Sequence, residues 1–366
     1  MHQNKHFVFV IGTRAQLIKV APVIIECEKR EFECTLLMTG QHLETMQDML
    51  DEFGVKSPQI FALQAREHAT LLSLIAWLPR AYIGIVKQLK LLSDSPKKVD
   101  VLVHGDTLST VLGALAGRCY GARLIHLESG LTSNRIFDPF PEEISRRIVF
   151  RLAHIAMCPN EETMAHMIRK YPRCKSVNTR GNTILNAIRI SGVNRDKRDL
   201  NTPYIVVSLH RFQNIYDHNR LLELVQLIND IANILPVHFV LHPATRKRLI
   251  KSRMLERLQQ NNGIKLLPRL GYGEFLRLAV ESACVLTDGG SNQEELAALG
   301  VPTIVMRQTT ERSDGLGENA IMEGELKESV LSFINQKMYN QLESKMNIEV
   351  KCNPSKTIVG YLVNEE

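Results

Sequence analysis

Short runs of β-branched and other apolar residues recur along the 366-residue chain, and stretches of helical character separate them. Before residue 180 these runs are 7–11, 35–38, 99–103, 124–127 and 154–157. The same rhythm restarts afterwards, with runs at 204–208, 238–241, 264–267, 284–287 and 303–306. Strands that alternate with helices predict parallel sheets with crossover helices. The sequence therefore predicts an α/β protein of two doubly wound domains, with a boundary near residue 180.

Glycine and polar residues follow the ends of these runs. In the first half they are 12–19, 104–107 and 128–130; in the second half they are 210–211, 242–243 and 288–291. The carboxyl ends of parallel strands form one edge of a sheet, and ligands of doubly wound folds bind at that edge. We therefore expect these residues to line a central cleft.

Composition narrows the class of protein. A hydrophobic fraction of 44% with 23% charged residues excludes a disordered or fibrous chain. The net charge of +6 suits an anionic small ligand as well as nucleic acid, so charge does not choose between them.

The seven cysteines are scattered and never form Cys-x-x-Cys, which argues against a disulfide framework and against a zinc ribbon. A location in the reducing cytoplasm fits this pattern best. The longest apolar helical segment, 69–78, is shorter than the ~20 residues of a membrane span, and we expect none.

Two glycine-rich segments of the second half have different interpretations. Asp288-Gly289-Gly290-Ser291 follows an apolar run and leads into a helical stretch, so its amides would favour a phosphate or diphosphate. The alternative is a turn in which glycine serves backbone geometry only. Gly315–Ala320 matches a dinucleotide pattern, but no strand stands immediately before it. We therefore expect no nicotinamide cofactor, and neither an ATP-binding P-loop nor a serine hydrolase elbow is present.

Three acidic residues, Asp106, Glu128 and Glu142, stand at predicted strand ends or in adjoining loops of the first half. The cationic residues predicted to lie near them are Arg14, Lys19, Arg146 and Arg147. Carboxylates beside cations in a partly dry cleft can hold separated pKa values, as general acid and general base roles require. Each carboxylate alone could instead be a helix cap. Their joint placement favours proton-transfer chemistry.

The ordered motifs of the chain resemble those of the UDP-N-acetylglucosamine 2-epimerase family, and most closely its non-hydrolysing branch. In the first half the similar segments are Gly12–Pro22, Thr39–His42, His104–Thr107, His126–Leu131 and Pro141–Arg146. In the second half they are Gly181–Thr183, His210–Arg211, Gln293–Glu295 and Met306–Arg312. The resemblance covers nearly the whole chain.

The resemblance implies a glycosyltransferase-B-like fold of two Rossmann-like domains, at 1–180 and 181–353, with a final helix in 354–366 that packs back on the first domain. It implies a homodimer that binds UDP mainly through the second domain, with the sugar facing the first. The implied reaction converts UDP-N-acetylglucosamine, or a modified UDP-N-acetylhexosamine, to its manno epimer for surface polysaccharide. No cofactor, metal ion or nucleic acid partner is expected.

The resemblance also implies roles for individual residues. Asp106, Glu128 and Glu142 would transfer protons and stabilise charge on the sugar ring, without a decision on which is acid and which is base. His210 would contact the diphosphate or act as an acid. The remaining substrate-binding residues implied are Arg14, Lys19, Arg146, Gly289, Gly290, Ser291, Glu295 and Arg312.

The chain departs from the family pattern at several positions. Gln16 and Gln213 stand where the family has glutamate, and an amide cannot take a proton. Ser291 is displaced by two places, and Leu43 replaces an arginine linked to allosteric binding of substrate. Three alternatives therefore stay open: a hydrolysing 2-epimerase, a glycosyltransferase of the same fold, and a sensor that binds a nucleotide sugar without turnover.

Overall fold

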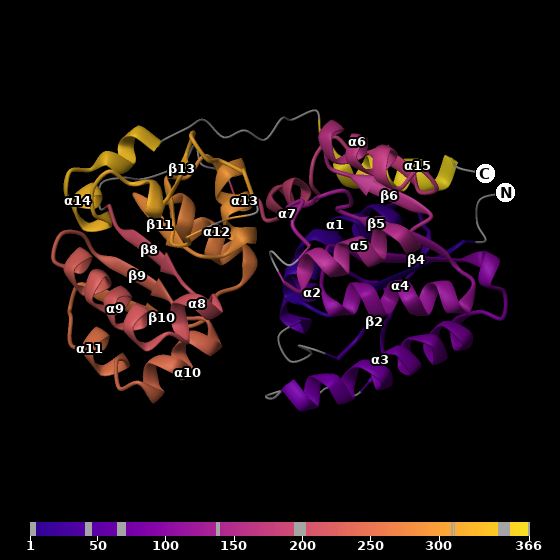
Figure 1. Ribbon diagram of the computed structural model, residues 1–366, viewed down its shortest axis with the longest axis horizontal. Coiled ribbons are helices and arrows are strands. Elements are labelled where there is room, and N and C mark those ends of the chain that lie inside the picture. The colour runs from indigo at the N-terminus through magenta and orange to yellow at the C-terminus, as the bar shows by residue number, and fades with distance from the viewer. Residues whose placement is uncertain are drawn as a thin grey trace. The chain divides into compact units, whose positions relative to one another are not determined.

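The computed structural model of the chain describes residues 5–40, 46–63, 71–136, 140–193, 203–308, 310, 312–342 and 352–364. For residues 71–75 it describes the backbone alone. The chain forms two compact units (Figure 1). The first comprises Met1–Ile190 together with Val350–Glu366, and the second comprises Ser191–Glu349. The first unit thus extends past the predicted boundary near residue 180.

A seven-stranded parallel sheet forms the centre of the first unit, in the order β3-β2-β1-β4-β5-β6-β7. Its strands are β1 (His6–Ile11), β2 (Glu33–Met38), β3 (Gln59–Phe61), β4 (Val99–His104), β5 (Arg123–Leu127), β6 (Ile155–Cys158) and β7 (Lys175–Asn178). In the register of the sheet, Val8 of β1 pairs with Thr35 of β2 and Val101 of β4. The strand order reverses between β1 and β4, which places the topological switch point, the usual ligand edge, beside these two strands.

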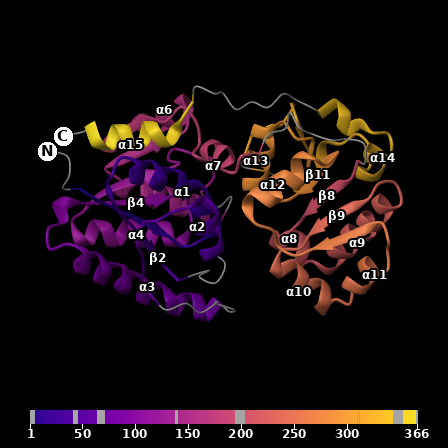
Figure 2. The same ribbon diagram turned by 180° about the vertical axis from the view of Figure 1, so that it is seen from behind.

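Helices cover both faces of this sheet. They are α1 (Arg14–Lys29), α2 (Gln47–Phe53), α3 (Leu71–Leu92), α4 (Leu108–Tyr120), α5 (Glu142–Leu152), α6 (Glu161–Lys170), α7 (Ile184–Ile190) and α15 (Pro354–Asn364), with the 3₁₀ turn η2 (Pro96–Lys98). α4 packs against α3 and α5, whereas α1 packs against α7 and α15. Figure 2 shows the yellow α15 beside the indigo α1. Because both faces are covered, β1 and β4 are buried along their whole length.

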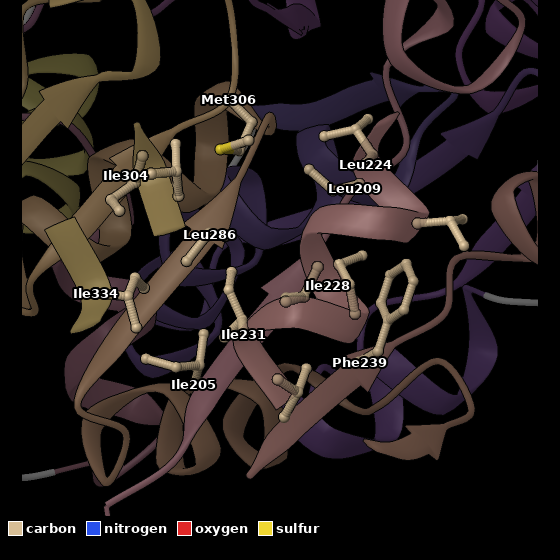
Figure 3. Close-up of a cluster of buried hydrophobic side chains, with 14 of the residues drawn as sticks. Ile205, Leu209, Leu224, Ile228, Ile231, Phe239, Leu286, Ile304, Met306 and Ile334 are labelled. Carbon is tan, nitrogen blue, oxygen red and sulfur yellow. The ribbon is translucent and has the colours of Figure 1, made fainter. Parts of the chain in front are cut away.

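The second unit repeats the design with a six-stranded parallel sheet in the order β10-β9-β8-β11-β12-β13. Its strands are β8 (Ile205–Ser208), β9 (Val237–Val240), β10 (Ile264–Leu267), β11 (Cys284–Thr287), β12 (Thr303–Val305) and β13 (Ala320–Met322). Its helices are α8 (Phe212–Ile215), α9 (His218–Ala232), α10 (Pro243–Lys251), α11 (Leu255–Gln259), α12 (Tyr272–Val280), α13 (Gly290–Leu299), α14 (Val330–Asn335), η4 (Glu323–Glu325) and η5 (Met338–Leu342). In the core of this unit, Ile228 and Ile231 of α9 pack with Ile205, Phe239 and Leu286 of the sheet (Figure 3).

The predicted fold class, two Rossmann-like doubly wound domains of the glycosyltransferase-B type, is confirmed. Every predicted apolar run forms a strand. The segment Gly315–Ala320 is a turn that leads into β13: Gly315 has φ +70° and its carbonyl accepts from the amide of Ala320 at 2.8 Å. Among the helices of the described ranges, none combines the length and apolar character that crossing a membrane demands.

Candidate functional site

The loop after β1 is tied to the end of β4. Thr13 caps α1, and its hydroxyl accepts from the amide of Gln16. The Oε1 of Gln16 accepts from the amide of Gly12 at 2.9 Å, and its Nε2 donates to the carbonyl of His104 at 2.8 Å. A Cβ on Gly12 would stand 1.9 Å from the hydroxyl oxygen of Ser109, so only glycine allows α4 to begin this close. The two strands at the switch point therefore end in one rigid assembly.

Glu128, directly after β5, is held by groups from three other segments. The Nζ of Lys19 and the Nδ2 of Asn182 each lie 2.5 Å from its Oε1, and the Nε2 of His104 lies 3.7 Å from its Oε2. Only 3% of the Lys19 side chain and 9% of the Glu128 side chain are exposed. Glu128 also has φ +58°, a left-handed conformation that costs roughly 1–3 kcal/mol and that the surrounding contacts must stabilise.

His126 supports the loops that carry these carboxylates. Its Nε2 lies 2.8 Å from the carbonyl of Gly105, and its Nδ1 lies 2.9 Å from the hydroxyl of Ser129. Because a carbonyl only accepts, Nε2 carries the proton and Nδ1 accepts from the serine. Burial lowers the pKa of His126 to about 4. The ring is therefore a neutral connector between the ends of β4 and β5.

Asp106 belongs to a second network of charged side chains, which includes Glu143 and Arg146 of α5. The guanidinium of Arg146 lies 2.5 Å from Asp106 and 3.6 Å from Glu143. The fully buried Glu143 also accepts from the hydroxyl of Thr132 at 2.6 Å and from Nε of Arg147 at 2.9 Å. Asp106 keeps 25% of its side chain exposed, so it can meet a ligand while paired. Glu143 was not among the predicted site residues, although the two adjacent glutamates of the Pro141–Arg146 motif were a signal for it.

The other two predicted residues of the first unit have different surroundings. Glu142 begins α5, and among the described residues no hydrogen-bond partner reaches its buried Oε2. Arg14 begins α1 and interacts with Asp48 and Glu52 of α2, while burial lowers the pKa of its guanidinium. Gln41, His42 and Leu43, which the sequence motifs included, lie outside the described residues.

Asp288 fixes the switch point of the second unit. It follows β11, is completely buried, and accepts from the amides of His210 and Arg211 and from Nδ2 of Asn214, each at 2.9 Å. Its Oδ1 also lies 3.3 Å from Nδ1 of His210. Asn214 donates further to the carbonyl of Met306 at 2.8 Å. The ends of β8, β11 and β12 are thereby joined around one carboxylate.

The N-terminus of α13 is surrounded by basic side chains. A Cβ on Gly289 would lie 3.0 Å from Cε1 of His210, and a Cβ on Gly290 would lie 3.2 Å from Nε of Arg312 and 3.5 Å from Nη2 of Arg211. The first amides of a helix have no partner within it and carry a partial positive charge. Together these groups form a concave anion-binding arrangement, since glycine lets the cations approach the backbone. Ser291 is the second residue of the helix.

Further arginines contribute to this positive region. Burial lowers the pKa of His210, and the charges of Arg211, Arg269 and Arg307 lower it further, against the opposing effect of Asp288. Arg269 and Arg307 follow β10 and β12. Arg269 was missed in the sequence and Arg307 was given no role there, although it lies in the Met306–Arg312 motif; their positions after strands were the signal that found the others. His210 is therefore a neutral side chain within a cationic field.

The predicted residues of α13 and of the loop after β12 are close together. Arg312 pairs with Glu294 at 2.8 Å, and Gln293 donates to the carbonyls of Arg312 and Asp314 at 3.2 and 2.9 Å. Glu295 is buried in the same helix, with 2% of its surface exposed. Thr309 and Glu311 lie outside the described residues. Within the described ranges, no group of three or more histidine, cysteine, aspartate and glutamate side chains is arranged to hold a metal ion.

Comparison with known proteins covers nearly the whole chain. The family model described as UDP-N-acetylglucosamine 2-epimerase matches residues 25–362. A UDP-N-acetylglucosamine 2-epimerase of Methanococcus maripaludis is 30% identical over 377 residues, which cover 98% of each protein. The structure of the Methanocaldococcus jannaschii UDP-GlcNAc 2-epimerase in complex with UDP-GlcNAc and UDP is similar with a TM-score of 0.78 and 25% identity, over 98% of this chain and 100% of that one. The Neisseria meningitidis UDP-GlcNAc 2-epimerase bound to UDP-GlcNAc gives a TM-score of 0.77 at 25% identity and the same coverage.

Proposed function

Since the chain belongs to the UDP-N-acetylglucosamine 2-epimerase family, we propose that it is a non-hydrolysing enzyme. It inverts C2 of UDP-N-acetylglucosamine, or of a modified UDP-N-acetylhexosamine, by eliminating UDP and adding it back. The observation that carries this proposal is the buried Lys19–Glu128 pair next to the Asp106–Arg146 pair, at the ligand edge of the first sheet. Carboxylates and cations in this arrangement supply proton transfer together with charge stabilisation.

The chemistry explains why both kinds of group are needed. The C2 proton of the sugar has no adjacent carbonyl, so its direct removal would leave an unstabilised carbanion behind a high barrier. Instead, a base takes the C2 proton while the bond between C1 and the diphosphate oxygen breaks. The electrons of the C2–H bond form a double bond between C1 and C2, and UDP leaves with the electrons of the C1–O bond. An acid then protonates the opposite face of C2, and the same phosphate oxygen bonds to C1 again.

The acidic residues of the first unit divide the proton transfers between them in this proposal. Lys19 and Asn182 hold the carboxylate of Glu128 by hydrogen bonds, while Asp106 combines an arginine partner with partial exposure. The buried Oε2 of Glu142 has no hydrogen-bond partner among the described residues, so it is available to a substrate proton or hydroxyl. Arg14 and Arg146 would bind the sugar and its phosphates.

The second unit holds the leaving group. Gly289, Gly290 and Ser291 would donate backbone and hydroxyl hydrogen bonds to the diphosphate, with His210 and Arg312 beside them. Glu295 would accept from the two ribose hydroxyls. A helix N-terminus and arginines bind a diphosphate trianion tightly, which favours its retention until it adds back. This retention supports the non-hydrolysing outcome over release of UDP.

Incubation in heavy water tests the reaction. UDP-N-acetylglucosamine should acquire deuterium at C2 and convert to its manno epimer without accumulation of UDP, as followed by NMR and mass spectrometry. Free UDP that rises in step with free sugar would instead identify a hydrolysing enzyme. Transfer to an added acceptor without exchange at C2 would identify a glycosyltransferase. A panel of modified UDP-N-acetylhexosamines in the same assay identifies the preferred sugar.

Asp106→Asn tests the acidic set directly. The amide keeps the shape but cannot exchange a proton, so the rate of C2 exchange should fall by roughly 10²–10⁴. The affinity for UDP should stay within about tenfold, or ~1.4 kcal/mol, because the second unit holds UDP. Asp94→Asn, an exposed position of the same unit, is the matched control and should keep full activity. Full activity of Asp106→Asn would exclude its catalytic role.

We also propose that the enzyme works as a cytoplasmic homodimer. All seven cysteines are free, which is typical of a reducing compartment. Leu78, Tyr82, Leu112 and Leu115 line an apolar hollow on α3 and α4, which supports an association surface. Light scattering that gives the mass of a single chain, 41.5 kDa, would contradict the dimer.

A further inference from the structure

A polar pocket lies within the first unit, on α5, α6 and the turn before β7. Its volume is about 690 Å³, and neither Asp106 nor Glu128 lines it. We call it the α5–α6 pocket. The lining residues that matter here are Arg147, Arg151, His166, Lys170, Tyr171 and Arg173. A concave site of this size is typical of sites for small molecules, which occupy roughly 300–1,000 Å³.

The charge of the α5–α6 pocket is strongly positive. Arg147, Arg151, Lys170 and Arg173 contribute four cations to its lining. The carboxylate that lines it, Glu143, is already engaged by Arg147, Arg146 and the hydroxyl of Thr132. One of the four cations, Arg147, is thus balanced by Glu143, and the lining keeps an excess of three positive charges. Arginine and lysine side chains in this arrangement favour a ligand with several negative charges, above all phosphate oxygens.

Arg151 of α5 lies over a packed aromatic cluster. The guanidinium of Arg151 lies 5.7 Å from the centre of the Tyr171 ring, and its Nη1 donates to the carbonyl of Arg147 at 2.9 Å. The Tyr171 ring packs edge-on against the buried Phe150 at 5.3 Å, and His166 contacts both rings. The guanidinium of Arg151 is thus positioned before any ligand binds, which reduces the entropy lost on binding.

Covalent thiol chemistry does not account for the pocket. Cys174 lines it, but burial raises the pKa of this thiol to about 12, so it stays protonated and unreactive at neutral pH. The excess of cations also disfavours a metal ion. From the concavity, the four cations and the packed aromatic cluster, we propose that the α5–α6 pocket binds a small phosphorylated molecule, at a site separate from that of the nucleotide sugar.

Hydrogen exchange with inorganic pyrophosphate as the probe tests this site on the full-length protein. Pyrophosphate should protect peptides from 147–152 and 166–174, with ionic strength held constant by sodium chloride in the reference sample. The test variant is Lys170→Gln/Arg173→Gln, because both side chains are exposed. Glu143 and Arg147 stay unchanged, since Glu143 contacts the arginine that pairs with Asp106. The matched control is Lys97→Gln/Lys98→Gln, two exposed lysines of the same unit.

The expected result is protection in the wild type and in the control, and affinity at least about tenfold weaker in the double variant, since two charge-assisted hydrogen bonds to the phosphate oxygens are removed. Absence of protection in these peptides at millimolar pyrophosphate would overturn the proposal. Protection of the test variant equal to that of the wild type would also overturn the proposal. None of these measurements depends on catalytic turnover. The binding result therefore stays interpretable even if the protein lacks the proposed epimerase activity. Pyrophosphate bound at α13 would appear separately, in peptides from 289–299.

Discussion

Gln16 uses both polar ends of its side chain to join two strand ends. Its oxygen accepts from the β1 loop, and its nitrogen donates to the carbonyl of His104 and the hydroxyl of Thr110. From the sequence, Gln16 was recognised only as an amide at a position where the family pattern has glutamate. The structure adds a physical reason for the amide here, because a carboxylate has no proton to donate to a carbonyl.

Gln16→Glu should therefore lower the stability of the protein. The new carboxylate oxygen would face the carbonyl of His104, which now lies 2.8 Å from Nε2. That carbonyl would lose this donor and keep the hydroxyl of Thr110 at 2.6 Å, while the two buried oxygens would repel each other. We expect a loss of about 1–3 kcal/mol in the free energy of unfolding, measured by urea denaturation. Gln213→Glu makes the same chemical change at an exposed position and should stay within about 0.5 kcal/mol of the wild type. Equal stability of the two variants would contradict this reading of Gln16.

His126 predicts a pH dependence of stability. Its pKa is about 4 in the folded protein and 6.5 when unfolded, so between these values the unfolded chain binds more protons. The free energy of unfolding should fall as pH decreases from about 6.5 towards 4, by up to roughly 3 kcal/mol from this residue. His126→Gln should remove that part of the change between pH 7 and pH 4.5 in urea titrations. His218→Gln, at an exposed position, should retain it; a full pH dependence in His126→Gln would refute the assignment.

At the scale of elements, α4 lies unusually close to the central strands. A Cβ on Gly113 would stand 2.8 Å from Cγ1 of Val10 and 2.9 Å from Cγ1 of Val103, and a Cβ on Gly117 would stand 3.1 Å from Val101. Glycines inside a helix normally weaken it by about 1 kcal/mol each relative to alanine. Here they allow α4 to approach β1 and β4, which positions Thr107 and the Asp106 loop at the start of the helix.

Gly113→Ala should destabilise the protein by about 1–3 kcal/mol, because overpacking against two buried valines outweighs the gain in helix propensity. Thermal and urea unfolding measure the change. Gly324→Ala is the control, since a Cβ there meets nothing within 4 Å. A Gly113→Ala protein as stable as the wild type would show that α4 can shift away from the sheet at no cost.

The strands that sequence reasoning missed, β3, β7 and β13, lie at edges of the two sheets, whereas the fourth edge strand, β10, was predicted from its apolar run 264–267. β3, β7 and β13 have three or four residues each, and β3 and β7 lack fully buried positions. Central strands such as β1 are covered on both faces and form continuous apolar runs, whereas these three short strands have no such run. Pairing with a neighbour in the sheet, rather than local composition, makes these segments strands.

At the scale of the whole molecule, the end of the chain returns to the first unit. α15 packs on α1 and α7, and Asn186 of α7 bonds to Asn353 and Ser355 at 3.0 Å. Ile358, Val359 and Leu362 of α15 are buried. Residues more than 160 positions apart in the sequence therefore belong to one folding unit.

Leu362→Ala should thus destabilise the first unit although it lies at the far end of the chain. Removing a buried leucine side chain costs about 2–5 kcal/mol. Hydrogen exchange should accelerate in β1 and α1, while amides of β8 and β11 keep their protection. Tyr361→Phe is the control: it changes the neighbouring residue but keeps the aromatic ring, so it should destabilise the first unit less than Leu362→Ala. Loss of protection in the second unit alone would contradict the division of the chain.

The sequence by itself determined the class of fold, because alternating apolar runs and helices can bury their apolar faces only as parallel sheets with crossovers. It also determined that polar residues after the strands meet at one edge of each sheet, as Glu128 and Asp288 do. Only the tertiary structure decided the partners of those residues: Lys19 and Asn182 for Glu128, Arg146 for Asp106, and the arginines around His210. Such pairs depend on burial and on distances between segments far apart in the chain, and these arise only when the sheets and helices pack.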